Sequence, residues 1–131
     1  MTLRTRLQPN LRRMAIAHAA TRTAVGLGLL LAPATARPWL GPAVDKGGGR
    51  VALQAFGVRD ALVGVGMLQS LRKGYPVRPW FRLALAFELV DAAATIQQRR
   101  HLPNTRIPDG IALFALSGII GGAAVGFGLD E

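Results

Sequence analysis

A chain of 131 residues has the length of a single domain, here residues 1–131. Half of the residues are hydrophobic and only 18% are charged, yet the formal net charge is +9. Nucleic-acid binding needs a basic stripe with polar or aromatic readout residues interleaved, whereas these basic residues gather at the ends of long apolar runs. We therefore expect no nucleic-acid partner and expect anionic lipid head groups as the counter-charge. The absence of cysteine excludes disulfides, thiolate nucleophiles and cysteine-ligated metals.

The N-terminal region joins a basic tail to an apolar run. Residues 1–13 hold four arginines and no acid, and residues 14–32 form the first apolar segment. The same order, followed by Ala34-Thr35-Ala36, is also typical of a signal peptide with its cleavage site. His18 and Arg22 interrupt this apolar run, and three further apolar segments would still need a membrane. A retained membrane helix is therefore the favoured interpretation.

Proline divides the chain into four apolar segments, at residues 14–32, 51–71, 80–96 and 111–129. No proline lies inside a segment, and since proline removes a donor and clashes with the preceding turn, this predicts four uninterrupted helices. Segments of about 17 to 21 residues match a hydrocarbon core of about 30 Å. A soluble bundle would carry charges along one face of each helix, whereas residues 111–129 carry none. The predicted fold is all-α, a polytopic membrane four-helix bundle with short loops.

The connections between segments predict the orientation of the chain. The glycine triplet at residues 47–49 lacks the pattern of a phosphate loop, so we interpret it as a flexible link. With the N-terminus in the cytoplasm, the basic residues on that side are Arg4, Arg6, Arg12, Arg13, Arg72, Lys73, Arg78 and Arg82. Those on the opposite side are Arg37, Lys46, Arg50, Arg99, Arg100 and Arg106. The excess favours a multi-pass cell-membrane protein with both termini in the cytoplasm.

Small residues recur at four- or seven-residue spacing in three segments. The sets are Ala20, Ala24 and Gly28; Gly57 and Gly64; and Gly118, Gly122 and Gly126. Such spacing lets two helix backbones approach closely. We therefore predict that these residues pack helices together, within the chain, in a homo-oligomer or against another membrane protein.

Ionisable side chains lie midway along three of the apolar segments. Arg22 is in the first, Arg59 and Asp60 in the second, and Glu88 and Asp91 in the third. Because an unpaired charge near the bilayer centre costs about 2.5 to 3.5 kcal/mol, these charges are expected to pair. Two arginines face three carboxyl groups, so one acid is in excess and is expected to carry a proton.

The predicted ligand or ion network comprises His18, Arg22, Arg59, Asp60, Glu88 and Asp91. One interpretation is structural, in which the ions fix how the helices pack. The other is functional, in which an acid beside arginines forms a proton-linked site or anchors a polar head group, with Glu88, Asp91 and Asp60 as the catalytic candidates. Only one histidine lies in an apolar segment, so no metal centre is expected, and no motif indicates a cofactor.

Three short motifs mark the middle of the chain: Gly57-Val58-Arg59-Asp60 with Gly64 and Gly66, then Arg78-Pro79-Trp80, then Asp91-Ala92. In these motifs the chain resembles short bacterial four-helix membrane proteins of the DoxX-like kind. The resemblance spans roughly residues 22–129. It implies the same architecture and a bacterial inner-membrane location, and it implies no established reaction.

Three functions stay open at this point. The first is a non-catalytic membrane subunit or assembly factor, in which the ion network is scaffold. The second is a small membrane enzyme, such as an isomerase or cyclase of a lipophilic substrate, with Glu88 or Asp91 as acid or base and an arginine stabilising negative charge. The third is a proton-coupled carrier. The second predicts a lipid-sized pocket that reaches the acids, and the sequence alone places the first slightly ahead.

Overall fold

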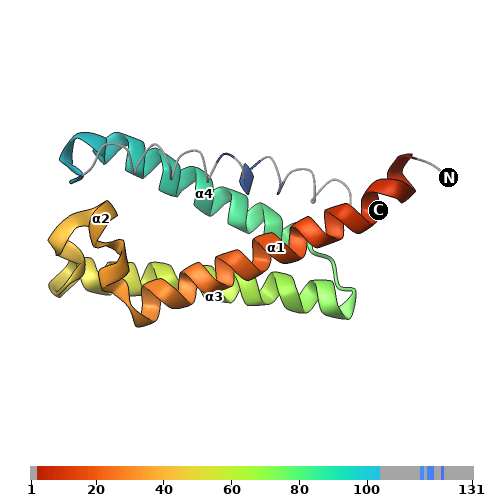
Figure 1. Cartoon of the computed structure of the whole chain (residues 1–131), viewed down its shortest axis with the longest axis horizontal. Coiled ribbons are helices and arrows are strands. Elements are labelled where there is room, and N and C mark those ends of the chain that lie inside the picture. Colours follow the sequence, from red (N-terminus) through yellow and green to blue (C-terminus); the bar gives the residue numbers. More distant parts are fainter. Residues whose placement is uncertain (1–2, 104–115, 117, 120–121, 123–131) are drawn as a thin grey trace.

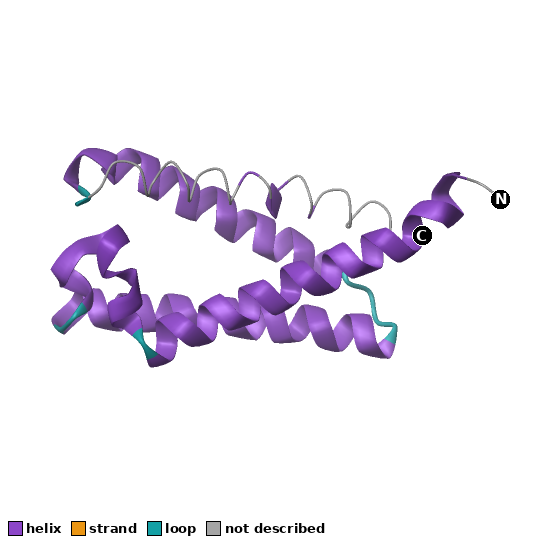
Figure 2. Cartoon of the chain, viewed as in Figure 1, coloured by secondary structure: helices purple, strands orange, loops and turns teal. Residues whose placement is uncertain are grey.

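The computed structural model describes residues 3–103, 116, 118, 119 and 122, and within these the ordered elements are helices with no strand (Figures 1 and 2). This confirms the all-α class. Three helices are long: α1 (Leu3–Leu31), α3 (Gly47–Lys73) and α4 (Arg78–Gln98). Four elements are short: η1 (Pro33–Ala36), α2 (Arg37–Leu40), η2 (Gly41–Val44) and η3 (Arg99–His101). Most of the segment predicted at residues 111–129 lies outside the described residues, and Leu116, Gly118, Ile119 and Gly122 within it are helical.

The first helix begins earlier than the sequence predicts. α1 starts at Leu3, so the basic tail predicted at residues 1–13 is largely helical and includes Pro9. A proline inside a helix frees the carbonyl four residues before it. Pro9 is exposed, so water can bind that carbonyl. The basic residues 12 and 13 therefore continue the first helix beyond its apolar part.

The glycine triplet at residues 47–49 is the first turn of α3, and the prediction of a flexible link there was wrong. Gly47 has a φ of 66°, a conformation that residues with a side chain rarely adopt. A Cβ on Gly49 would collide with the carbonyl of Ala43, because η2 packs closely on the start of α3. Backbone conformation thus explains Gly47 and close packing explains Gly49. The connection before α3 is filled by η1, α2 and η2.

The most extensive contact between described elements is that of α1 with α3, which lie side by side (Figure 1). At their crossing, a Cβ on Gly26 would lie 2.6 Å from the Gly57 carbonyl oxygen, and one on Gly57 would lie 2.6 Å from that of Gly26. Gly64 meets the backbone of Ala19 and Thr23 in the same manner. Gly57 and Gly64 are therefore sites of backbone-to-backbone packing.

α1 packs on α3 through a face other than the one that carries Ala20, Ala24 and Gly28. Ala20 and Ala24 are exposed, and a Cβ on Gly28 would meet nothing within 4 Å. Successive residues of a helix are about 100° apart, so Ala24 lies about 200° around the axis from Arg22. Because Arg22 faces the interior, the small residues beside it, among them Gly26, face α3 instead. Small residues at four-residue spacing occur on both faces of α1. The burial of Arg22 determines which of the two faces packs on α3.

The third long helix is held less tightly. Its first half packs on α1 and α3 through a cluster of buried apolar side chains: Ala15, Ala19, Val63, Met67, Leu71, Val77, Phe81 and Ala84. Beyond this cluster α4 diverges from α3, and α2 lies at the wide end (Figure 1). A second cluster, of Ala36, Val44 and Leu53, closes that end.

The distribution of polarity is reversed relative to a water-soluble bundle. Arg22, Asp60 and Glu88 are each at most 8% exposed, whereas many large apolar side chains on all three long helices face outward. These are Met14, Ile16, Val25, Leu27, Leu31, Val51, Val58, Leu62, Val65, Leu83, Leu89, Val90 and Ile96. A soluble helix buries its apolar stripe and exposes its charges. Between the basic ends, the outer surface is therefore largely apolar, while the ions are buried among apolar side chains.

Among the described residues, two helices are long and apolar enough to cross a membrane, Pro9–Leu31 and Gly47–Lys73, each with a mean hydropathy of 1.4. The predicted span at residues 80–96 is not among them, because α4 carries Arg82, Glu88 and Asp91 within one apolar stretch. The predicted span at 111–129 falls largely outside the described residues. Length and composition alone thus support two of the four predicted spans.

Candidate functional site

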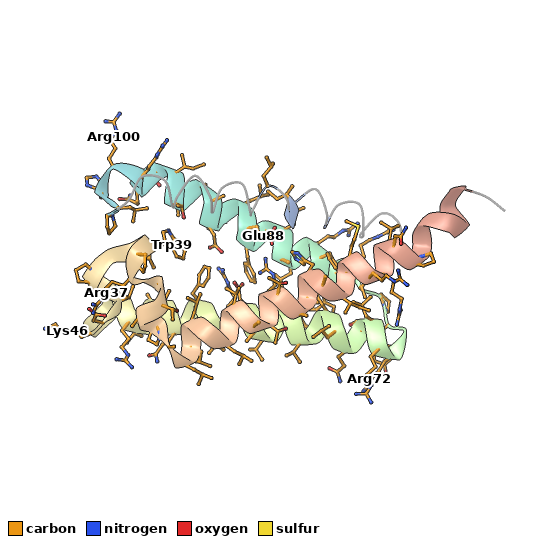
Figure 3. The ribbon with its side chains drawn as sticks, in the orientation of Figure 1. Arg37, Trp39, Lys46, Arg72, Glu88 and Arg100 are labelled. Carbon is orange, nitrogen blue, oxygen red and sulfur yellow. The ribbon has the colours of Figure 1, made fainter. Side chains whose placement is uncertain are left out.

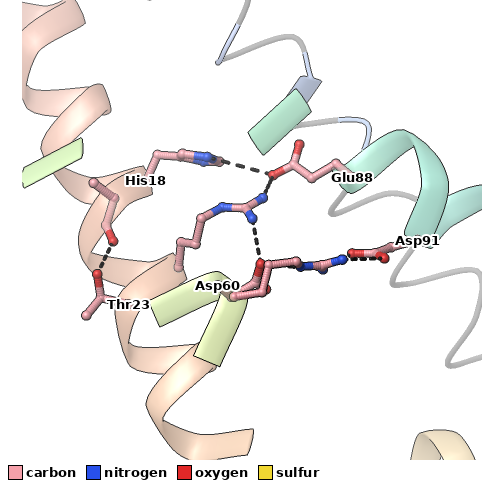
Figure 4. Close-up of polar contacts among 8 residues, drawn as sticks. His18, Thr23, Asp60, Glu88 and Asp91 are labelled. Carbon is pink, nitrogen blue, oxygen red and sulfur yellow. Dashed lines mark hydrogen bonds and ion pairs between the residues drawn. The ribbon is translucent and has the colours of Figure 1, made fainter. Parts of the chain in front are cut away.

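A buried guanidinium lies at the centre of the site. Arg22 of α1 donates from Nη1 to Oδ1 of Asp60 at 2.7 Å and from Nη2 to Oε1 of Glu88 (Figure 4). The three side chains are 7%, 10% and 9% exposed. Since Asp60 is on α3 and Glu88 on α4, this one arginine joins all three long helices.

A second arginine forms an adjacent pair nearer the surface. Arg59 binds both oxygens of Asp91, with Nη1 3.3 Å from Oδ1 and Nη2 2.5 Å from Oδ2. Its guanidinium also lies 4.1 Å from the ring centre of Phe56 and 4.4 Å from that of Phe87. Such stacking favours a cation where water is scarce. Nη2 of Arg59 is 3.5 Å from Oδ1 of Asp60, so the two pairs form one continuous network.

His18 lies at the other edge of the network. Its Nε2 is 3.7 Å from Oε1 of Glu88, and its ring stacks on Phe81 with centroids 5.7 Å apart. The distance exceeds that of a normal hydrogen bond. His18 therefore stays next to Glu88 through packing, while Arg22 makes the short contact to the same oxygen.

The acids of the network occupy the middle of their helices. Asp60 lies 13 residues from each end of α3, and Glu88 lies 10 residues from each end of α4. At 1.5 Å per residue these positions are about 15 to 20 Å from a helix end. If the helices cross a bilayer, the network lies near its centre, where each unpaired charge would cost the most.

A cavity of about 400 Å³ opens beside the network. Its charged wall consists of Arg22, Asp60, Glu88 and Asp91, and its remaining lining consists of Val25, Leu29, Thr35, Ala36, Trp39, Phe56 and Ala92. Figure 3 shows Trp39 at the α2 end and Glu88 near the middle of α4. A mostly apolar cavity of this size with a few convergent polar groups is typical of a small-molecule site.

A smaller cavity of about 40 Å³ lies among His18, Arg22, Val25, Asp60 and Glu88. It has room for one water molecule and is lined by several polar groups. Three buried N–H groups have no hydrogen-bond partner among the described residues: Nε of Arg22, Nε of Arg59 and Nε1 of Trp39. The small cavity can supply a water to Arg22, whereas Trp39 faces the large cavity.

The structure brings all six residues of the predicted network together, and their roles stay predictions. Gly118 lies against the Glu88 carboxylate, Gly122 lies against Phe81, and Gly126 is outside the described residues. The aromatic residues of the site were missed by sequence reasoning. Phe56 could have been found from its three-residue spacing to Arg59, which places both on one helix face. Trp39 carried no such signal, because it belongs to the connection between helices.

Within the described part of the chain, no group of three histidine, aspartate or glutamate residues is placed to hold a metal ion. Comparison with protein-family models, with curated proteins and with solved structures finds no match. The resemblance to DoxX-like membrane proteins therefore stays a prediction.

Proposed function

We propose that this chain is a multi-pass protein of a bacterial cell membrane, with both termini in the cytoplasm and anionic lipids at its basic ends. The observation that supports the membrane is the reversed polarity, since an apolar surface around buried ions suits a hydrocarbon solvent. Arg12 donates to the Leu71 carbonyl, so the basic start of α1 and the basic turn after α3 lie at one end. Figure 3 labels Arg72 at this end of the molecule. At the opposite end it labels Arg37, Lys46 and Arg100.

The two lysines give a direct test of this orientation. Lys46 and Lys73 are exposed at opposite ends, and the chain has no cysteine to remove. A membrane-impermeant maleimide is expected to label a Lys46→Cys variant in intact bacterial spheroplasts, and a Lys73→Cys variant only after the membrane is opened. Labelling of both variants in intact spheroplasts, or recovery of the protein in the soluble fraction, would contradict the topology.

We further propose that the chain binds a lipophilic small molecule in the 400 Å³ cavity, with the ion network as its polar wall. The single observation that carries this proposal is the continuity of the cavity, which extends from Trp39 to the three carboxylates. A network serving only as scaffold needs no apolar cavity against its charges. The arrangement favours a ligand whose polar group meets the acids while its apolar body lies against Trp39, Phe56 and Leu29.

Any acid–base chemistry on this ligand falls to Glu88 or Asp60 in this proposal. Both oxygens of Asp91 are bound by Arg59, so that acid is the least available of the three candidates. Glu88 shares only its Oε1 with Arg22 and His18 among the contacts of the described residues. An isomerase or cyclase reaction at this site requires a substrate that reaches Glu88.

Filling the cavity tests whether a ligand binds there. Ala92 lines the cavity, whereas its neighbour Ala93 is exposed. In native mass spectra of protein extracted in mild detergent, the wild type and Ala93→Phe are expected to retain a lipophilic molecule. Ala92→Phe is expected to retain at least tenfold less, because the phenyl ring occupies the ligand's volume. Equal retention by the two variants, or no adduct after incubation with total membrane lipids, would contradict the proposal.

One observation favours a second function, that of a non-catalytic membrane subunit. The exposed ridge of Ala20, Ala24 and Gly28 on α1 has the small-residue spacing by which membrane helices associate. The same spectra distinguish this function from ligand binding. A complex of two or more chains that dissociates on Ala24→Leu would support the subunit, and a strictly monomeric protein would count against it.

A further inference from the structure

The charges on the cavity wall are unbalanced. Asp60, Glu88 and Asp91 line the large cavity together with Arg22 as the only cation among the described lining residues. Arg59 compensates Asp91 from outside the lining, and it is already held there by two contacts to that carboxylate. With His18 neutral, the network holds three acids against two arginines, so the proton expected on one acid balances its charge in the empty cavity, and a bound cation can take the place of that proton. In a poorly solvated site, such an excess of acid favours a positively charged partner.

Two further residues of the cavity lining are aromatic. Trp39 and Phe56 meet edge to face with centroids 6.4 Å apart, and both line the cavity. The indole Nε1–H of Trp39 is buried without a hydrogen-bond partner among the described residues. An unpaired buried donor is unusual in a folded protein, and the ring that carries it lines the cavity. Aromatic faces also attract cations, and tryptophan does so most strongly.

We infer that the cavity selects lipophilic cations, that is, molecules with a positively charged nitrogen or phosphorus centre and an apolar body. This inference rests on the proposed ligand-binding function and names the class of its ligand. The positive centre lies against Asp60 and Glu88, and the apolar body lies against Trp39, Phe56 and Leu29. Lipophilic anions of equal size are rejected, because an anion cannot replace the proton on the excess acid and would be repelled by the ionised carboxylates. The affinity for neutral molecules lies between the affinities for cations and for anions.

Three probes of related shape test the sign of the charge: tetraphenylphosphonium as the cation, tetraphenylborate as the anion and triphenylphosphine oxide as the neutral molecule. The chain has two tryptophans, so the Trp80→Phe variant leaves Trp39 as the only reporter of indole fluorescence. In detergent micelles, with empty micelles as the blank, we expect phosphonium to quench Trp39 with an affinity at least tenfold higher than borate. The Trp39→Phe variant, which keeps Trp80, should give no saturable quenching.

Removing one carboxylate provides the matched control. Glu88→Gln keeps the size of the side chain and leaves the Arg22–Asp60 pair in place, so phosphonium affinity should fall at least tenfold while the affinity of the phosphine oxide stays within twofold. If Glu88→Gln does not fold, Asp91→Asn serves instead, because that side chain is more exposed, at 24%.

The outcomes separate the two proposals. If tetraphenylborate or the phosphine oxide binds at Trp39 as tightly as the phosphonium, the cation selectivity is overturned. The proposal that the cavity binds a lipophilic ligand would not be affected by that result. Failure of all three probes to reach Trp39 would overturn both. Saturable quenching that persists in Trp39→Phe would mean that the probe binds elsewhere, and it would also overturn the inference.

Discussion

Replacing Arg22 with methionine is expected to lower the free energy of unfolding by about 3 to 5 kcal/mol, the largest effect of any single change proposed for this chain. Arg22 contacts both Asp60 and Glu88, and none of these side chains is more than 10% exposed. The variant would leave the buried Glu88 without its arginine and Asp60 with only the 3.5 Å contact to Arg59. The measurement is unfolding by SDS titration in mixed micelles, followed by helical circular dichroism.

The control for this prediction removes all three charges. A triple variant, Arg22→Met with Asp60→Asn and Glu88→Gln, keeps the approximate shape of the site and leaves no buried charge unpaired. Replacing a complete buried ion group by neutral side chains is often close to neutral in stability, so the triple variant should recover most of the loss. A decrease in the free energy of unfolding of less than about 1 kcal/mol in Arg22→Met would contradict the buried network. Ion pairs that contribute so little to stability are those exposed to solvent at the surface.

A second large effect is expected at the crossing of α1 and α3. Gly26→Ala should cost about 3 kcal/mol, near the upper end of the range for overpacking. The added methyl group would meet backbone atoms of Gly57 and Ala61, and backbone atoms cannot rotate aside as a side chain can. The two helices would have to separate, which would weaken the packing along the whole interface. The same SDS titration measures the effect.

Gly28→Ala is the matched control for Gly26→Ala, since it makes the same change two residues along the same helix. A methyl group there would meet nothing within 4 Å. Alanine is favoured over glycine in a helix by about 0.5 to 1 kcal/mol, so this variant should be neutral or slightly stabilised. Equal losses for the two variants would mean that α1 does not present the Gly26 face to α3.

The helices and the ion network could be predicted from the sequence because both follow from burial. The segments predicted at residues 51–71 and 80–96 are the centres of Gly47–Lys73 and Arg78–Gln98. Charges midway along apolar runs had to pair, and apart from the neighbours Arg59 and Asp60 the opposite charges lay on other segments. Arg22, Asp60 and Glu88 accordingly meet in the structure.

The rotation of α1 and the shape of the cavity could not be predicted. Four-residue spacing occurs on two faces of α1, and the choice of Gly26 over Gly28 depends on where Arg22 finds its partner. The cavity depends on the divergence of α4 and on Trp39, which no local pattern relates to the acids. Such features arise from contacts between distant segments, which composition and periodicity do not encode.

The weak apolar character of α4 has a consequence for how the protein is made. α4 carries Arg82, Glu88 and Asp91 and is not apolar enough to qualify as a membrane span alone, whereas α1 and α3 are. Each of its central acids opposes entry into lipid. In the chain order, however, both arginines that bind these acids are synthesised before α4 leaves the ribosome. The α1–α3 pair can thus act as the template on which α4 inserts, so the order of the helices along the chain is itself part of the folding information.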